Sequence, residues 1–203
     1  MDLILIRHVE TQNNKSGVYM GRSIDTPTTP EGARRFKCTL QAFRERVPIP
    51  KDAVTLCSPS LRCKQTLEIV NDTLGLPHSI IVASEFAETD YGDFEGKDAD
   101  DIKRQYPNLI KTWLHKPAQM RFPNGESYVE VQRRAIRKIR ELEVAWPDKM
   151  VLVCTHVDVI KMILCALLDI SINMKVFFDI SNGSFTYITS TYRGLTVKTL
   201  NFV

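Results

Sequence analysis

Short, wholly apolar runs alternate with amphipathic segments along this chain, and this pattern limits the fold more than any other feature. Residues 3–6 and 150–154 contain no polar side chain, as expected of strands buried on both faces of a sheet. Residues 53–57 and 79–83 are further short strand candidates. Because strands that alternate with helices form parallel sheets covered on both sides, the pattern predicts an α/β fold, a three-layer α/β/α sandwich with a mostly parallel mixed sheet.

Helices are predicted where apolar residues recur at steps of three and four. Thr29-Pro30 starts one helix, with a capping threonine and a proline at the first helical position, and Ser58-Pro59 starts another. Two long helices are expected at 126–146 and 157–168, and short helical pieces at 98–105 and 109–115.

The remaining segments complete the predicted organisation. Residues 85–123 are polar and irregular, which is typical of a lid or insertion over the sheet. Residues 184–190 and 195–202 resemble a hairpin around Tyr192-Arg193-Gly194. No repeat and no linker of biased composition interrupts the chain, so residues 1–203 are predicted to form one domain.

The composition argues against several classes of protein. The net charge of +3 on 203 residues implies no nucleic-acid partner, and no run approaches the roughly 20 apolar residues of a membrane span. The five cysteines show no C-x-x-C spacing and are predicted to be buried, reduced thiols of a cytoplasmic protein. The four histidines lack the spacings typical of metal ligands, so nothing in the sequence proposes a metal or a cofactor.

Two histidines stand directly after apolar runs. His8 follows the first predicted strand and His156 the fourth. Each alone is more simply a satisfied residue at a strand end, but ligands of open α/β sheets bind beyond the carboxyl ends of the strands. Arg7 ends a buried strand and needs an anion, either a structural carboxylate or a ligand. Arg62 lies in the first turn of a helix, where the helix dipole also favours anions.

These residues belong to six blocks that resemble, in order, the motifs of the histidine phosphatase (phosphoglycerate mutase-like) superfamily. The blocks are Arg7-His8-Val9-Glu10-Thr11 with Asn14; Gly21, Asp25, Pro27, Thr29 and Gly32; residues 57–66; residues 88–96; residues 123–127; and Cys154-Thr155-His156. The block at 88–96 looks like the phosphatase branch, above all the alpha-ribazole phosphatases and their broad-specificity relatives. The resemblance covers nearly the whole chain and implies the phosphoglycerate mutase-like fold.

The resemblance also implies a site and a mechanism. His8 would be the nucleophile and form a phosphohistidine, held neutral by Arg7, Arg62 and a protonated His156, which would also bind the phosphate without any metal. Glu88 would be the general acid, its pKa raised by burial and by the phosphate. Further phosphate contacts are expected from Asn14 and Val157, and structural roles from Thr11, as a turn residue, and Ser58, as a helix cap.

Two valines depart from the family pattern. Val9 and Val157 stand where the family usually has glycine after each catalytic histidine. Either the backbone there has ordinary dihedral angles, or the valines narrow the pocket. Asp158 is expected to add negative charge near the rim of the site. The five core positions of the motif are all filled, which favours activity; they are Arg7, His8, Arg62, Glu88 and His156.

The sequence therefore predicts a metal-independent phosphomonoesterase that acts on a small phosphorylated metabolite, with alpha-ribazole 5'-phosphate as the leading candidate. A phosphoglycerate mutase-type phosphotransferase and a non-catalytic phosphate-binding relative stay open as alternatives. Aromatic and apolar residues of the lid are expected to receive the leaving group; they are Phe86, Tyr91, Phe94, Trp113, Met120 and Phe122. A monomer and a homodimer are both compatible with the sequence.

Overall fold

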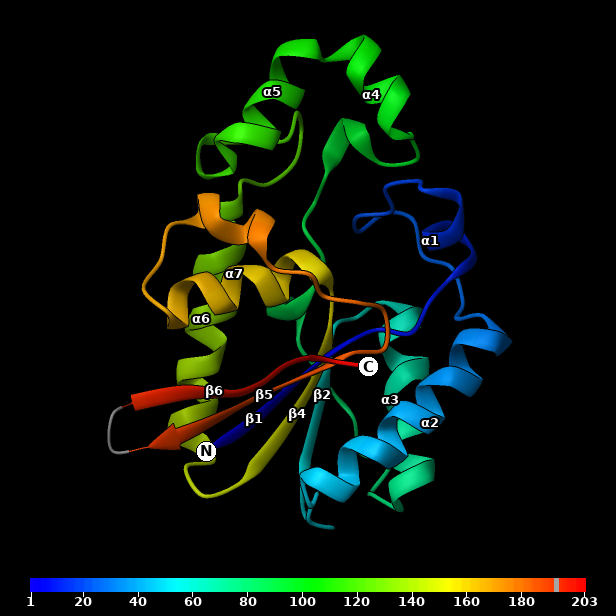
Figure 1. The fold of residues 1–203 in the computed structure, drawn as a ribbon, viewed down its shortest axis with the longest axis vertical. Helices are drawn as coiled ribbons and strands as arrows, with labels where there is room; N and C mark the ends of the chain where they lie inside the picture. Colours follow the sequence, from blue (N-terminus) through cyan, green and yellow to red (C-terminus); the bar gives the residue numbers. More distant parts are fainter. Residues whose placement is uncertain (192–193) are drawn as a thin grey trace.

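The computed structural model describes residues 1–191 and 194–203, and its centre is a six-stranded sheet of order β3-β2-β4-β1-β5-β6 (Figure 1). The strands are β1 Asp2–Arg7, β2 Val54–Cys57, β3 Ile81–Val82, β4 Met150–Thr155, β5 Phe185–Thr191 and β6 Gly194–Phe202. The neighbours from β3 to β1 pair in parallel, whereas β5 is antiparallel to both β1 and β6. The mostly parallel mixed sheet is therefore confirmed.

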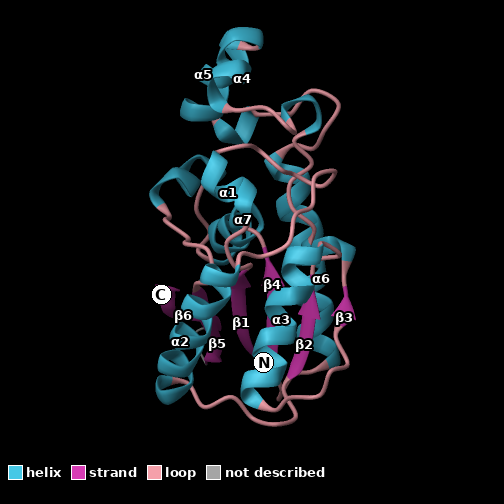
Figure 2. Ribbon diagram, turned by 90° about the vertical axis from the view of Figure 1, so that its right-hand side faces the viewer, coloured by secondary structure: helices cyan, strands magenta, loops and turns pink. Residues whose placement is uncertain are grey.

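Helices cover both faces of this sheet, as the α/β/α prediction requires. The α-helices are α1 Gln12–Ser16, α2 Pro30–Arg46, α3 Leu61–Leu74, α4 Ala99–Gln105, α5 Pro107–His115, α6 Tyr128–Ala145 and α7 Val157–Leu167. Alternate residues of β1 enter two separate cores, because successive side chains of a strand point to opposite faces. Ile4 and Ile6 pack with α2 and α3, and Leu3 and Leu5 pack with α6 and α7 (Figures 1 and 2).

The segment predicted as a lid extends beyond the ends of the parallel strands. It contains three short 3₁₀ turns along with α4 and α5: η1 Ser84–Phe86, η2 Gly92–Phe94 and η3 Pro117–Gln119; a fourth turn, η4 Ile172–Phe177, lies elsewhere in the sequence. In Figures 1 and 2, α4 and α5 form the end of the molecule farthest from the sheet. The chain thus builds a cap of short elements above the edge where the parallel strands end.

The third helix begins later than the sequence indicates. The prediction placed its start at Ser58-Pro59, but α3 begins at Leu61 with Ser60 as its N-cap. The Ser58 amide donates to the Cys154 carbonyl at 3.0 Å, so the chain still pairs with the sheet at this residue and cannot yet turn into a helix. The other deviations are smaller: β3 is shorter than 79–83, and α1 and η4 were not predicted.

The C-terminal strands and the cysteines complete the comparison. The two predicted strands are confirmed as β5 and β6, while Tyr192 and Arg193 of the predicted turn lie outside the described residues. All five cysteines are free, but only four are buried. Cys38 is exposed, because it lies on α2 away from the buried Phe36 and Leu40. Within the described part of the chain, no helix is long and apolar enough to cross a bilayer.

Phe43→Ala is expected to reduce the free energy of unfolding by about 3–5 kcal/mol, because it empties a filled position of the core. The Phe43 ring is fully buried, stacks on Phe185 at 4.5 Å between centroids and meets Phe202 edge-on at 5.5 Å. Urea unfolding measures the change. Phe177→Ala is the control, since Phe177 is 76% exposed and its loss should change stability by less than about 0.5 kcal/mol. Equal losses in the two variants would contradict this description of the core.

Candidate active site

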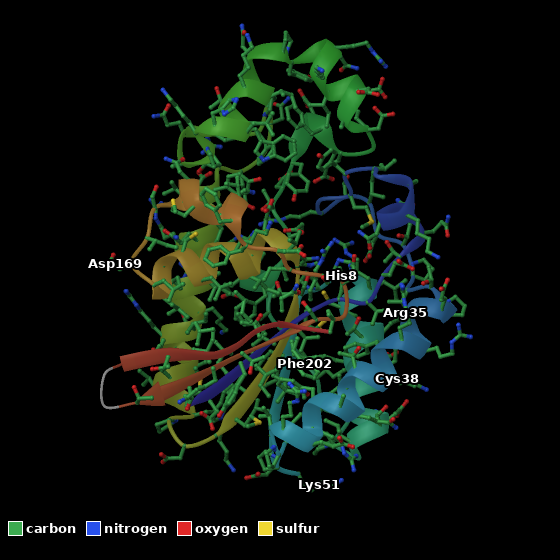
Figure 3. The ribbon with its side chains drawn as sticks, viewed as in Figure 1. His8, Arg35, Cys38, Lys51, Asp169 and Phe202 are labelled. Carbon is green, nitrogen blue, oxygen red and sulfur yellow. The ribbon has the colours of Figure 1, made fainter. Side chains whose placement is uncertain are left out.

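The two predicted histidines meet at the carboxyl ends of two adjacent parallel strands. His8 follows β1 and His156 follows β4, and the register pairs Arg7 with Thr155 directly before them. The two rings are 5.2 Å apart between centroids and inclined at 61°. Figure 3 labels His8 where the chain leaves the end of β1. Residues separated by almost the whole sequence thus share one site, as expected for this class of sheet.

His8 is arranged as a neutral ring with one free nitrogen. Its Nδ1 lies 2.7 Å from the Val9 carbonyl oxygen, which can only accept, so Nδ1 carries the hydrogen and Nε2 keeps its lone pair. Burial lowers the pKa of His8 well below its usual range, and the positive charges of Arg62 and Arg7 lower it further. The ring is therefore unprotonated at neutral pH, as a nucleophile must be.

Arg62, which is buried, and Arg7, which is half-buried, present guanidinium groups whose hydrogen-bonding capacity is only partly used. Arg62 donates from Nη1 to Asp25 Oδ1 at 3.0 Å and from Nη2 to the Gly21 carbonyl at 3.0 Å. Arg7 donates from Nη1 to the Ile180 carbonyl at 2.5 Å. Among the described residues, the Nε of each arginine is buried and has no hydrogen-bond partner. Since an unsatisfied buried donor is costly, the two side chains are arranged to receive an anion.

His156 does not have the charge that was predicted. Arg62 Nη2 lies 3.3 Å from Nδ1 and donates to it, so the hydrogen of the ring sits on Nε2, which is 2.7 Å from Ser58 Oγ. Burial lowers the pKa of His156 well below its usual range, with Arg62 as the next cause. His156 is therefore neutral in the free protein, and the predicted protonated form is wrong there. Burial and the two arginines lower the pKa of His8 without any positive charge on His156.

Ser58 orients His156 instead of capping a helix. Its side chain lies at the end of β2 and accepts from the His156 ring. The prediction of a helix cap is wrong because α3 starts three residues later, after Ser60. Thr66 was not predicted as a site residue, but it holds the backbone directly after His8. Its Oγ1 accepts from the Val9 amide at 3.0 Å and donates to the Arg62 carbonyl at 2.7 Å.

Glu88 is a buried carboxyl group on the opposite side of His156 from Ser58. Its Oε2 lies 4.0 Å from His156 Nδ1, and its Oε1 accepts from the Thr89 amide at 2.9 Å. Burial raises the pKa of Glu88 to about 7, and the Asp158 carboxylate contributes. The predicted effect of burial is confirmed, whereas the contribution of Asp158 was missed. A carboxyl group with such a pKa can give and take a proton near neutral pH.

A cavity of about 290 Å³ opens in front of these groups. Its walls are formed by Arg7, His8, Asn13, Asn14, Gly17, Val18, Tyr19, Met20, Gly21, Arg62, Glu88, Tyr91 and Val157. All the residues predicted for the site therefore face one cavity except His156, which lies behind it and contacts Arg62 and Glu88.

Asn14 has one end of its amide already engaged. Its Oδ1 accepts from the Thr11 amide at 3.0 Å in the capping box of α1. Thr11 is thus the N-cap of α1, a more specific role than the predicted turn residue. Because the oxygen is occupied, the Nδ2 group is the end of Asn14 that could donate to an anion.

The two valines differ in their effect on the cavity. Neither has a positive φ, so their backbone is ordinary and the first of the two expectations holds. Val9 is buried with the core on the α2 side of the sheet, and one of its methyl groups lies 3.0 Å from where Gly32 would carry a Cβ. Val157 is the first residue of α7 and lines the cavity. Only the second valine therefore reduces the space for a ligand.

Asp158 does not lie at the rim as predicted. It is buried and accepts from Tyr91, Tyr128 and Lys175 at 2.7–2.9 Å. The sequence contained no signal for this arrangement, because Lys175 comes from a separate turn, η4, and Tyr128 from the start of α6. The charge of Asp158 is paired inside the protein and is not exposed at the entrance to the cavity.

Most of the predicted lid residues are packing residues. Of the six, only Tyr91 lines the cavity. Phe94, Trp113 and Phe122 contact one another at 5.4–5.9 Å between ring centroids and form part of the core beneath the cap. Tyr19 was not predicted, but it lines the cavity and lies 5.9 Å from Tyr91. The aromatic wall of the cavity therefore consists of Tyr19 and Tyr91.

Known proteins resemble this chain over nearly its full length. A family model described as histidine phosphatase superfamily (branch 1) matches residues 3–203. Phosphoserine phosphatase 1 of Hydrogenobacter thermophilus is 26% identical over 200 residues, which cover 98% of this chain and 91% of that protein. The adenosylcobalamin/alpha-ribazole phosphatase of Salmonella typhimurium is 27% identical over 201 residues, which cover 99% and 96%.

A solved structure supports the same conclusion about the fold. Bacillus stearothermophilus YhfR superposes on this chain with a TM-score of 0.88 at 27% identity, covering 100% of this chain and 97% of that one. Together with the family model, this match confirms the predicted resemblance and fold.

Glu88→Gln is expected to stabilise the protein in a pH-dependent way. Burial raises the pKa of Glu88 from 4.5 to about 7. Below pH 4.5 both states hold the proton; between the two values only the folded state does, so the wild type loses stability as the pH rises. A neutral glutamine avoids this loss, and its stability gain should be about 2 kcal/mol larger at about pH 8 than at about pH 5.

Urea unfolding of variant and wild type at both pH values measures this difference, and other titrating groups cancel in the comparison. Glu141→Gln is the matched control, because Glu141 is an exposed carboxylate of α6. The same stability gain at both pH values for Glu88→Gln would show that this carboxyl group titrates normally.

Proposed function

The chain belongs to the histidine phosphatase superfamily (branch 1), and from this premise we propose that it is a phosphatase, which hydrolyses small phosphate monoesters through a phosphohistidine on His8. The observation that carries the proposal is the arrangement at the end of the sheet. An unprotonated His8 faces the same cavity as two arginines whose buried Nε groups have no partner among the described residues. The guanidinium groups of these arginines carry the positive charge that a phosphate dianion requires.

In the first step His8 Nε2 attacks phosphorus and the bond from phosphorus to the ester oxygen breaks. Glu88, protonated through its raised pKa, gives its proton to the leaving oxygen. Arg7 and Arg62 hold the phosphoryl oxygens and stabilise the charge that they carry in the transition state. The products of this step are the free alcohol, the phosphohistidine and the Glu88 carboxylate.

In the second step water replaces the histidine on phosphorus. The Glu88 carboxylate takes a proton from the attacking water, the bond between phosphorus and Nε2 breaks, and inorganic phosphate leaves. His8 recovers its free Nε2, and Glu88 is again protonated for the next cycle. The position of Glu88, 4.0 Å from His156 and on the cavity wall, supports the use of one carboxyl group in both steps.

The roles of the remaining residues follow from their contacts. His156, held by Ser58, keeps the Arg62 guanidinium in place through its Nδ1. Asn14 can donate to the phosphate from Nδ2, and Val157 closes one side of the cavity. Because two arginines supply the positive charge, the proposed mechanism assigns no step to a metal ion or a cofactor.

For the substrate, we propose a small phosphorylated metabolite with an aromatic or apolar leaving group. Among the named relatives, one acts on phosphoserine and another on alpha-ribazole phosphate at nearly the same identity, so the names alone do not choose. The wall formed by Tyr19 and Tyr91 favours a leaving group with a flat apolar face. This supports alpha-ribazole 5'-phosphate as the first substrate to assay, with phosphoserine as its comparison.

Three further expectations belong to the same proposal. We propose that residues 1–203 work as one catalytic domain and that residues 85–123 are its lid. The partner is a small phosphorylated molecule and neither nucleic acid nor membrane, with the chain acting as a monomer or a homodimer. A reducing cytoplasm suits its free cysteines.

His8→Ala is expected to reduce hydrolysis of p-nitrophenyl phosphate by about a thousandfold or more, because it removes the nucleophile. The assay contains a chelator and is run at about pH 6, near the ordinary pKa of histidine. His78→Ala is the matched control and should keep full activity, since His78 is exposed and its side chain pairs with Asp72 on the surface. Rapid quenching should trap an acid-labile phosphoenzyme in the wild type.

Other results in this experiment select the alternatives. Activity that the chelator abolishes, or that survives in His8→Ala, would refute the proposed mechanism. Isomerisation of phosphoglycerate without release of phosphate would establish a mutase. Binding of phosphate or vanadate without turnover of any ester would establish a non-catalytic relative.

Glu88→Gln is expected to affect poor leaving groups more than good ones. An alkoxide needs a proton when it departs, whereas p-nitrophenolate leaves with little proton transfer, so a general acid matters mainly for the former. The variant should lose about 100-fold or more in kcat on an alkyl phosphate and at least tenfold less than that on p-nitrophenyl phosphate. Steady-state assays of both esters measure the ratio. Equal losses on both would remove Glu88 from the role of general acid.

A further inference from the structure

An ion pair is buried directly behind the cavity wall. Asp158, in the first turn of α7, accepts from Lys175 Nζ at 2.7 Å, and both residues are at most 6% exposed. The second carboxylate oxygen accepts from the Tyr91 hydroxyl at 2.8 Å and from the Tyr128 hydroxyl at 2.9 Å. The Lys175 ammonium also lies 3.6 Å from the centre of the Tyr128 ring. Three side chains from three other segments thus meet at the Asp158 carboxylate.

Such a pair requires an explanation other than stability. Removing two charges from water costs about as much as their attraction returns, so a buried pair often adds little to the free energy of folding. A carboxylate bonded to three donors nevertheless has only one position. The question is therefore which part of the molecule this carboxylate holds in place.

Tyr91 is the residue that Asp158 holds at the site. Its ring lines the cavity beside Glu88, while its hydroxyl group points to Asp158. Tyr128 continues the chain of contacts away from the site, because its hydroxyl accepts from Trp113 Nε1 at 2.7 Å. Trp113 belongs to α5 in the cap. The carboxylate therefore links the cavity wall to the cap above it.

Asp158 also acts on Glu88 through its charge. It is the main source of negative potential that raises the pKa of Glu88, second only to burial. The charged and titratable side chains that surround Glu88 come from every neighbouring element. They are Arg7 of β1, Arg62 of α3, His156 before α7, Asp158 of α7, and Tyr91 and Tyr128 from the cap and α6. Arg22, in the loop after α1, and Arg134 of α6 also donate to the Glu88 carbonyl, at 2.9 and 3.1 Å. Arg7 and Arg62 favour the carboxylate form of Glu88, so Asp158 is the charged group that opposes them.

We propose that Asp158 and Lys175 are paired positioning residues of the active site. Asp158 fixes the Tyr91 wall and keeps Glu88 in the acid form, and Lys175 balances the charge of Asp158 and so limits this effect. Neither residue touches the reacting atoms. The inference rests on the proposed function, in which Glu88 is the general acid.

Removing the charge of Asp158 and removing that of Lys175 should shift the pH dependence of hydrolysis in opposite directions. Phenyl phosphate is the probe, because its leaving group needs a proton, and the alkaline limb of kcat/KM reports the loss of that proton from Glu88. Asp158→Asn removes the negative charge and should move this limb to lower pH by about one unit. Lys175→Met leaves the negative charge unbalanced and should move it to higher pH. The double variant should fall between the two single variants.

A second variant tests the contact with Tyr91 separately. Tyr91→Phe keeps the ring but loses the hydroxyl that Asp158 holds, so KM for phenyl phosphate should rise about fivefold with a smaller change in kcat. Lys138→Met and Glu141→Gln are the matched controls, since this pair on α6 is exposed and should move neither the limb nor KM. Thermal melting shows that each variant is folded before it is assayed.

The outcomes separate this inference from the proposed function. Wild-type protein that hydrolyses no phosphate ester would refute the function itself. If the wild type is active, single variants that shift the limb in the same direction, or not at all, overturn the inference alone. If unpaired charge prevents the single variants from folding, the unchanged KM of Tyr91→Phe would overturn it, and the expected rise would support it.

Discussion

The placement of two guanidinium groups at the end of the sheet, one buried and one half-buried, is the constraint on which the site depends. Arg7 and Arg62 cannot lose their charge, so each must be compensated inside the protein or by a ligand. Asp25 and backbone carbonyls satisfy part of this need, and the buried Nε groups remain unpartnered among the described residues. Burial keeps the neighbouring histidines unprotonated, and the positive field of these groups adds to this effect and prepares a place for an oxyanion.

A second, negative field acts on the same cavity from behind. Burial raises the pKa of Glu88 and lowers that of His8; Asp158 strengthens the first shift and the arginines the second, so the two groups are pushed toward opposite protonation states. A carboxyl group that stays protonated beside an imidazole that stays neutral is the combination that a nucleophile and a general acid require. The separation of these two pKa values depends on the position of Asp158 on the far side of Tyr91, where its charge acts on Glu88 but does not contact the ligand.

Each part of the site that was predicted correctly is marked by a pattern in the residues next to it in the sequence. His8 and His156 each follow an apolar strand, and the rule for strand ends places them together without knowledge of any contact. Glu88 was recognisable only through its motif. Ser58 and Asp158 were assigned wrongly because their partners are remote: His156 lies 98 residues from Ser58, and Lys175 belongs to a turn with no periodic pattern. Cys38 was misjudged because a helix buries only one of its faces.

The sequence by itself determined the layered α/β architecture, the strand ends that carry the histidines, and the arginines that face an anion. These follow from hydrophobic periodicity and from the geometry common to all parallel sheets. Only the tertiary structure decided the charge of His156, the contribution of Asp158 to the raised pKa of Glu88 and the identity of the cavity wall. Each of these depends on the distance and burial of groups from separate segments, since electrostatic energies and desolvation vary with three-dimensional surroundings that no local pattern records.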